Sequence, residues 1–315
     1  MSMEGPRYLS PAALDSLELS TTEVVESIEA LLRSAKQSRA WSAPKPVIKP
    51  PDGRYLMATL SAADDPPFMA VKALLLNPRN PERGLSSINS LVVLQDGDTG
   101  LPLAVIDGNW ITAVRTAGLS AVAAKRLANP RASTIAFIGC GVQAQSHLRA
   151  LVELFPLKEV RAFGRGAANR DALCRTAERR GLAAIAAATA RDAISAADIV
   201  VSSVPLTPRP DPFVDARWLK PGAFATLPDL ALPWLRDSMG AFARIVIDDR
   251  EQEATMPEPM VEPQLVSGDL ADLVAGSVAE VSSRSERTAF VFRGMGLADL
   301  ALAALAYQRA SGGVR

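Results

Sequence analysis

A glycine-rich turn between an apolar strand and a helix constrains the fold of this chain most. The run Ile135–Ala144 reads IAFIGCGVQA, in which Gly139, Gly141 and Ala144 form the pattern G-x-G-x-x-A. The first glycine permits a tight turn, the second lets a pyrophosphate approach the backbone, and the alanine lets strand and helix pack closely. The helix N-terminus offers unpaired N–H groups to phosphates. The sequence predicts a dinucleotide site here; the alternative is an ordinary strand–helix turn that happens to use glycine.

The segments around this turn alternate between strands and helices. We expect strands at 134–138, 160–163, 198–201, 223–227 and 244–248, and helices at 142–155, 167–180 and 191–196, with a short alanine-rich strand between the last two helices. This alternation is typical of a parallel sheet with helices on both faces. The predicted fold class is therefore α/β, with a Rossmann-type dinucleotide-binding domain.

The N-terminal part has a different pattern. Ser20 and Glu23 form a capping box for a helix that ends near Arg39, before a proline-rich stretch. Short apolar strands are expected at 55–60, 68–76, 90–94 and 103–106, with helices at 109–128 and 295–310. A tight turn at 96–100 favours antiparallel pairing of the strands beside it. These segments predict a second, α+β domain.

Length and composition narrow the classes of function. A chain of 315 residues suggests roughly two domains. Its 34 basic and 34 acidic residues give no net charge, which argues against general nucleic-acid binding. No apolar run reaches the length of about 18 residues that spans a membrane, and the first residues lack a signal peptide's apolar core. We therefore expect a cytoplasmic protein with no membrane and no nucleic-acid partner.

The scarcity of cysteine and histidine limits the chemistry. Cys140, Cys174 and the single His147 cannot form a four-cysteine zinc site or a multi-histidine metal site within one chain. Acid–base chemistry falls mainly to Lys, Asp, Glu, Tyr or water. Cys140 lies inside the glycine turn and is expected to be a small packing residue. His147 follows that turn on a helix and is expected to be a structural or surface residue.

The end of the second strand of the parallel sheet predicts the cofactor. NAD sites place an Asp or Glu there for the ribose hydroxyls. This sequence has no acid from Val160 to Arg170, and Arg165 stands where a 2′-phosphate would lie. A guanidinium suits a phosphate, so NADP(H) is favoured over NAD(H). The alternative is that Arg165 and Arg170 are solvated surface residues.

Two cations stand in apolar surroundings in the N-terminal part. Lys72 interrupts the strand-like run 68–76, and Arg115 lies in the helix start 110–118. A lysine in so apolar a run is costly unless it is paired or functional. Both residues could line a pocket for a small anion such as an amino-acid carboxylate. The alternative is that Lys72 points to solvent from an edge strand.

Several ordered motifs resemble the ornithine cyclodeaminase/mu-crystallin family. They are Leu94–Ser120 (LQDGDTGLPLAVIDGNWITAVRTAGLS), Val71-Lys72 with Asn77-Pro78, IGCGVQAQ at the glycine turn, and Met295–Leu300 (MGLADL). The resemblance implies two domains. Residues 1–117, completed by a C-terminal helix at 293–315, would bind substrate and dimerise, and residues 118–292 would form the Rossmann domain. It also implies a homodimer that forms through the N-terminal sheet.

The resemblance implies roles for particular residues. Arg115 would hold the substrate carboxylate, Lys72 would contact it or transfer a proton, and Lys45 stands where the family often has a substrate-binding arginine. The expected cofactor contacts are Thr116, Gly139, Gly141, Val142, Gln143, Ser202, Ser203 and Val204. Asp229 is the counterpart of the family's catalytic aspartate, although the segment before it is shorter and its surroundings differ. The alternative for Asp229 is a helix cap before Trp234.

The resemblance implies an NAD(P)-dependent enzyme that transfers hydride at the α-carbon of a small amino acid or its imine. Two reactions fit: ornithine cyclodeamination, and reduction of a cyclic ketimine such as pyrroline-2-carboxylate. The missing acid favours NADP, which suits a reductase better. A non-catalytic, NADP-dependent small-ligand-binding protein of the mu-crystallin type is the alternative. The presence of both Lys72 and Arg115 argues for retained chemistry.

Overall fold

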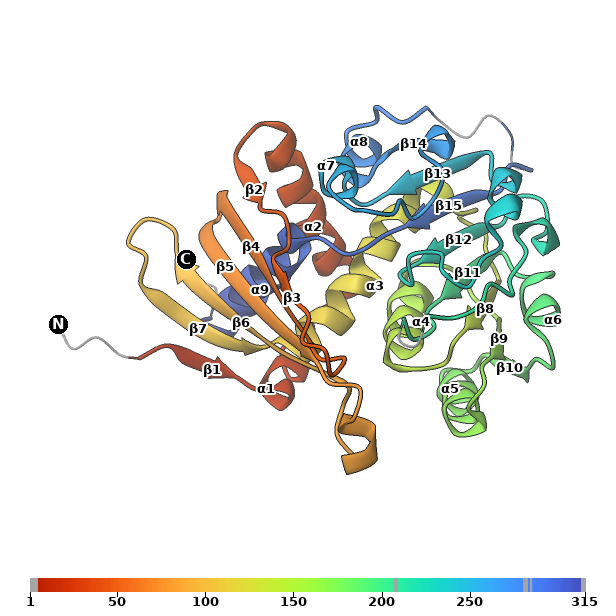
Figure 1. Ribbon diagram of the computed structural model, residues 1–315, viewed down its shortest axis with the longest axis horizontal. Coiled ribbons are helices and arrows are strands. Elements are labelled where there is room, and N and C mark those ends of the chain that lie inside the picture. Colours follow the sequence, from red (N-terminus) through yellow and green to blue (C-terminus); the bar gives the residue numbers. More distant parts are fainter. Residues whose placement is uncertain (1–4, 207–208, 280–282, 284, 313–315) are drawn as a thin grey trace. The chain divides into compact units, whose positions relative to one another are not determined.

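The computed structural model describes residues 5–206, 209–279, 283 and 285–312. The chain divides into two compact units, Met1–Arg115 with Met295–Arg315 and Thr116–Gly294. The outer ends of the predicted first domain, 1–4 and 313–315, lie outside the described residues. Each unit is built around its own sheet (Figure 1). The α/β fold, with a Rossmann-type unit and an α+β unit, is confirmed. The roles predicted for the first unit remain predictions.

The first unit contains a seven-stranded sheet in the order β1-β7-β6-β5-β4-β2, with β3 also paired to β4. The long strands form an antiparallel meander: β4 (Tyr55–Asp64), β5 (Pro67–Leu76), β6 (Ile88–Asp96) and β7 (Pro102–Asp107). Three short strands complete it: β1 (Arg7–Leu9), β2 (Ala40–Ser42) and β3 (Val47–Ile48). The sequence predicted the four long strands and the antiparallel pairing of β6 with β7, but missed these three short strands. Within the sheet, β5 is central rather than an edge strand.

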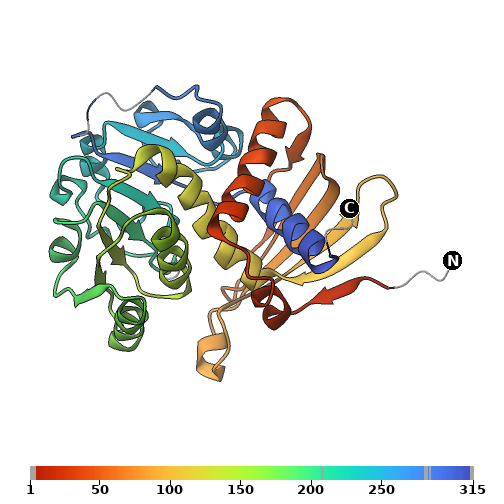
Figure 2. The ribbon, with the colours of Figure 1, turned by 180° about the vertical axis from the view of Figure 1, so that it is seen from behind.

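Helices cover one face of this sheet. α9 (Gly296–Ala310) contacts β4, β5 and β6, and α2 (Thr21–Lys36) packs beside it (Figure 2). The predicted capping box at Ser20 and Glu23 is confirmed. α9 is buried along most of its length because its residues are almost all small or apolar. The short helix α1 (Pro11–Asp15) precedes α2, and α3 (Gly108–Leu127) follows β7 and contributes residues to both units.

The second unit contains an eight-stranded sheet in the order β10-β9-β8-β11-β12-β15-β13-β14, in which every pairing is parallel. Its strands are β8 (Thr134–Ile138), β9 (Glu159–Phe163), β10 (Ala183–Ala186), β11 (Ile199–Ser202), β12 (Phe224–Leu227), β13 (Arg244–Ile247), β14 (Val266–Asp269) and β15 (Thr288–Val291). The strand order reverses between β8 and β11, and open α/β sheets bind ligands beyond the carboxyl ends of strands at such a point. The sequence missed β14 and β15, and β15 separates β12 from β13.

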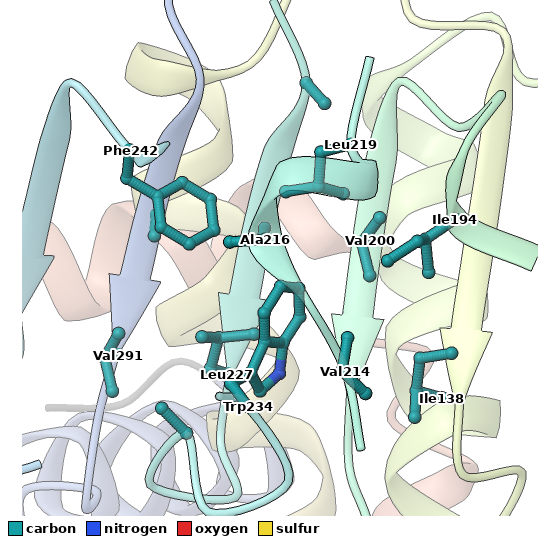
Figure 3. Close-up of a cluster of buried hydrophobic side chains, with 14 of the residues drawn as sticks. Ile138, Ile194, Val200, Val214, Ala216, Leu219, Leu227, Trp234, Phe242 and Val291 are labelled. Carbon is teal, nitrogen blue, oxygen red and sulfur yellow. The ribbon is translucent and has the colours of Figure 1, made fainter. Parts of the chain in front are cut away.

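The helices of this unit are α4 (Val142–Leu154), α5 (Ala167–Arg179), α6 (Ala190–Ile194), α7 (Arg250–Ala254) and α8 (Leu270–Val274). Short 3-10 turns occur at Ala216–Trp218, Arg236–Ala241 and Pro263–Leu265, and in the first unit at Asn80–Arg83. Side chains from β8, β11, β12, β15 and β13 gather with Trp234 and Phe242 in a core on one face of the sheet (Figure 3). This core fixes the strands whose ends carry the predicted nucleotide site.

Candidate active site

Lys72 is buried inside the first unit. It lies on β5 between β4 and β6, and its side chain is 1% exposed. Alternation along the strand turns it to the same face as Phe68, Ala70 and Leu74, all of which are buried. Its Nζ donates to Asp299 Oδ1 at 2.7 Å and lies 3.5 Å from Thr112 Oγ1. The alternative of a solvated lysine on an edge strand is therefore wrong.

Asp299 is the residue that the sequence analysis missed. It lies in the first turn of α9 and is 1% exposed. Its Oδ1 also accepts a bond from Arg115 Nε at 3.1 Å, and its Oδ2 accepts one from Thr59 Oγ1 at 3.2 Å. The available signal was a single acid in the apolar run GLADLALAALA. A buried acid needs buried cationic partners, and Lys72 and Arg115 were already candidates.

The cluster of Lys72, Arg115 and Asp299 carries an excess of positive charge. Burial lowers the pKa of Lys72 to about 8, the Asp299 carboxylate opposes this, and the charges of Arg115 and Lys45 add to the lowering. Burial alone would raise the pKa of Asp299, but Lys72, Arg115 and Lys45 hold it below its ordinary value. The half-buried Lys45 thus acts on the same cluster. Such a site attracts a small anion.

Arg115 uses only part of its guanidinium within the chain. Its side chain is 10% exposed, and its Nε bonds to Asp299. Among the residues that the structure describes, no group bonds to its two terminal amino groups. These two nitrogens can donate parallel hydrogen bonds to one carboxylate.

The glycine turn of the second unit has the geometry that a dinucleotide requires. Gly139 has φ +89°, and a Cβ there would overlap the carbonyl oxygen of Ser203, so only glycine fits. A Cβ on Gly141 would meet no atom within 4 Å, which leaves open space before the first turn of α4. Cys140 is buried, and burial raises the pKa of its thiol to about 11, as expected for a packing residue.

Two polar atoms beside the turn support a ligand there. Within the described residues, Gln143 Oε1 and Ser203 Oγ are buried and have no hydrogen-bond partner. Buried polar atoms are rarely left unpaired in native proteins. Ser203 follows β11 and Gln143 lies in the first turn of α4, so both stand at the strand-order reversal. The residues present therefore fit a phosphate- and ribose-bearing cofactor.

Asp229 follows β12 and is completely enclosed. Its Oδ2 accepts bonds from Ser202 Oγ at 2.6 Å and from the Val204 backbone N–H at 3.2 Å. Its Oδ1 has no partner among the described residues. Burial raises the pKa of this carboxyl to about 7. The structure thus joins Asp229 to Ser202 and Val204, which belong to a different segment of the sequence.

The backbone after Asp229 is strained. Leu230 and Ala231 have φ values of +60° and +55°, which residues other than glycine rarely adopt. Residues 229–233 form turns rather than a helix start, so the helix-cap alternative for Asp229 is wrong. A strained turn and a protonatable buried carboxyl at one strand end are typical of functional sites.

Comparison with known proteins decides the family. The model of the ornithine cyclodeaminase/mu-crystallin family matches residues 11–314. This chain belongs to that family. It is 30% identical to the ketimine reductase mu-crystallin of Mus musculus over 264 residues, which cover 82% of this chain and 80% of that protein.

Two solved structures of family relatives have the same fold. The Δ1-pyrroline-2-carboxylate reductase of Thermococcus litoralis, in complex with NADH and L-proline, superposes with a TM-score of 0.88 at 26% identity and covers 97% of this chain and 98% of that one. An archaeal alanine dehydrogenase dimer with bound NAD gives a TM-score of 0.86 at 28% identity and covers 98% and 97%.

The two arginines that the sequence placed after the second strand of the parallel sheet differ in their contacts. Arg170 pairs with Asp171 at 2.9 Å. Arg165 is exposed and makes no hydrogen bond or ion pair with any described residue. Of the two guanidinium groups, only that of Arg165 has no partner among the described residues. Two predicted contacts remain: Thr116 is buried on α3, and Val142, the first residue of α4, is exposed.

In this member of the family, His147 is structural. It is fully buried, with Nε2 at 2.8 Å from Ser120 Oγ and Nδ1 at 2.7 Å from the Gln143 carbonyl. Ser120 Oγ lies 2.7 Å from Thr226 Oγ1, so the network joins α3, α4 and β12. Burial lowers the pKa of His147 to about 4. The surface alternative for His147 is wrong.

Within the described residues, no helix is long and apolar enough to cross a membrane. The same residues contain no group of three or more His, Cys, Asp or Glu side chains suited to a metal ion.

Proposed function

We propose that this chain is an NAD(P)-dependent oxidoreductase that transfers hydride at the α-carbon of a small amino acid or its imine. The buried cluster of Lys72, Arg115 and Asp299 carries the proposal, because it combines an anion clamp with a lysine of lowered pKa. The names of relatives support it: a ketimine reductase, a pyrroline-2-carboxylate reductase with NADH and L-proline, and an alanine dehydrogenase with NAD.

The cofactor would be held by the second unit. The glycine turn and the first turn of α4 would bind its phosphates, and the end of β11 would lie along the nucleotide. These contacts are Thr116, Gly139, Gly141, Val142, Gln143, Ser202, Ser203 and Val204. The open space at Gly141 and the unpaired atoms of Gln143 and Ser203 support this assignment. When bound, the nicotinamide supplies or accepts the hydride.

The charged side chains would bind the substrate and move a proton. The terminal amino groups of Arg115 would hold the carboxylate, with Lys45 adding positive charge. Lys72 would give a proton to the imine nitrogen during reduction and take it back during oxidation. A group works best as acid or base when its pKa is near the working pH, which suits Lys72 at about 8 and Asp229 at about 7.

A substrate panel tests the proposal. The purified protein is mixed with NADPH or NADH and with pyrroline-2-carboxylate, piperideine-2-carboxylate, or pyruvate with ammonia, and nucleotide oxidation is followed. L-Ornithine with NAD tests cyclodeamination separately. We expect turnover of at least one imine. Nucleotide binding without turnover of any substrate would instead identify the non-catalytic, small-ligand-binding alternative.

We propose that NADP(H) is preferred over NAD(H) because Arg165 is unpaired at the end of β9, where no acid stands. Arg165→Ala should weaken NADPH binding by about 10- to 100-fold, the range of one charge-assisted bond to phosphate, and leave NADH binding nearly unchanged. Calorimetric titration with both nucleotides measures this, and Arg180→Ala on the same unit is the control. A wild-type protein that binds NADH more tightly would contradict the proposal.

We also propose a homodimer that forms through the sheet of the first unit. The face of this sheet turned away from α9 exposes Leu60, Met69 and Leu91 by more than two fifths of their surface. Contiguous exposed apolar side chains mark interaction surfaces, and the related archaeal alanine dehydrogenase is a dimer. Members of closed dimers present the same patch to each other. The cytoplasmic location expected from the sequence remains a prediction.

Leu60→Glu should convert the dimer to a monomer, because the carboxylate would be buried without a partner in the apolar contact between the two copies. Analytical ultracentrifugation at micromolar concentration measures the change. Ile185→Glu, at an exposed apolar position of the second unit, is the control and should leave the mass unchanged. A wild-type protein that sediments as a monomer would exclude this interface.

A further inference from the structure

One carboxylate in the first unit binds side chains from three other elements. Asp299, on α9, accepts bonds from Thr59 on β4, Lys72 on β5 and Arg115 on α3. We propose that Asp299 is the positioning residue of the substrate site: it keeps Lys72 in the charged, proton-donating form and turns Arg115 so that its terminal amino groups meet the substrate carboxylate. This inference rests on the proposed function.

The charge of Lys72 needs a counter-ion. An ammonium this deeply buried loses its proton far more easily than one in water. Arg115 from α3 and Lys45 from the segment between β2 and β3 both repel its charge, and Thr112 is neutral. Asp299 is the negative charge that acts on Lys72 most strongly, from 2.7 Å. Without it, Lys72 would be neutral at the pH where imine reduction requires a proton donor.

The bond to Arg115 sets the direction of the guanidinium. A guanidinium can hold a carboxylate either through Nε and one terminal nitrogen or through both terminal nitrogens. Asp299 Oδ1 occupies Nε at 3.1 Å. The edge formed by the two terminal nitrogens is then the one left for a substrate carboxylate. Asp299 thereby selects how the substrate is held without touching it.

Asp299 itself is held rigidly. It lies in the first turn of α9, where the helix dipole favours a negative charge. Helix α9 starts close to β4: a Cβ on Gly296 would lie 3.4 Å from the Leu60 carbonyl oxygen and 3.5 Å from Thr59 Cβ. The Thr59 hydroxyl also fixes Oδ2. The carboxylate therefore has one orientation, in which Oδ1 faces both cations.

The pH dependence of Asp299→Asn tests the proposal. In wild type, kcat/KM for imine reduction should fall as pH rises through about 8, where Lys72 loses its proton. Without the carboxylate the charged form of Lys72 is less favoured, so the fall should move about 1–3 pH units lower. Asp299→Glu should restore the wild-type profile in part. Asp64→Asn, at the exposed end of β4, is the control and should leave it unchanged.

A purely structural role gives a different result. If Asp299→Asn folds, binds NADPH and loses activity equally at every pH, the proposal is overturned. If that variant does not fold, Thr59→Val tests the positioning role of Asp299 instead. It keeps the charge but frees Oδ2, so KM should rise several-fold while the pH profile stays in place. Unchanged KM in Thr59→Val would then refute the positioning role.

A binding measurement separates this inference from the proposed function. L-Proline is titrated into wild type and Asp299→Asn, each saturated with NADH, between pH 6 and 9. Weaker binding in the variant, with the difference growing as pH rises through the range, supports the role of Asp299 even if no substrate of the panel is turned over. If wild type binds L-proline and Asp299→Asn binds it with the same affinity at every pH, the inference is overturned. The proposed function would still stand.

Discussion

Lys72→Ala should lower kcat for imine reduction by about 10²–10⁴-fold, the usual loss when a general acid–base group is removed. The fold should survive, because Asp299 keeps its bonds to Arg115 and Thr59 and is not left as an unpaired buried charge. Steady-state kinetics on the substrate that the panel selects measure the loss, with circular dichroism as the check on folding.

Arg115→Lys is the matched comparison, since it keeps the charge but loses the pair of parallel hydrogen bonds. It should mainly raise KM, whereas Lys72→Ala should mainly lower kcat. A near-normal kcat in Lys72→Ala would mean that Lys72 only contacts the carboxylate. The proton donor would then have to be Asp229, whose pKa of about 7 also suits the task, or a bound water.

The parts of the fold that could be predicted from sequence depend on local physics. Some patterns act within a few residues: a capping box, the spacing of apolar residues in a helix, and a glycine that needs positive φ. The helix at Thr21–Lys36 and the turn at Gly139 can therefore be predicted from the sequence. The strand Thr288–Val291 was not predicted, although strands of the same length were predicted at 160–163 and 198–201. The insertion of that strand between β12 and β13 depends on long-range pairing, which spacing does not report.

The candidate site also contains residues that the sequence predicts and contacts that it does not. Lys72 was identified because a charge in an apolar strand conflicts with burial. Its partner Asp299 is 227 residues away and belongs to the last helix, so no local pattern joins them. Ser202 and Asp229 are likewise joined only when β11 and β12 pair side by side. The charge balance of the site is therefore a property of the tertiary structure.

Gly141→Val should abolish nucleotide binding while the protein stays folded. Gly141 has φ −83°, which valine adopts readily, and a Cβ there meets no protein atom within 4 Å. The substitution should therefore change the free energy of unfolding little. The side chain would instead stand in the open space before α4, where a pyrophosphate must approach the backbone N–H groups. Affinity for NADPH and NADH should fall on the order of 100-fold or more, about 2.8 kcal/mol.

The neighbouring glycine provides the contrasting variant. Gly139→Ala forces a side chain into φ +89° and against the Ser203 carbonyl, so it should lower the melting temperature, whereas Gly141→Val should not. Calorimetric titration with both nucleotides and thermal unfolding of the three proteins measure the two effects independently. Because Gly141→Val changes only the space beyond the backbone, nucleotide binding that survives it would place the dinucleotide somewhere other than this turn.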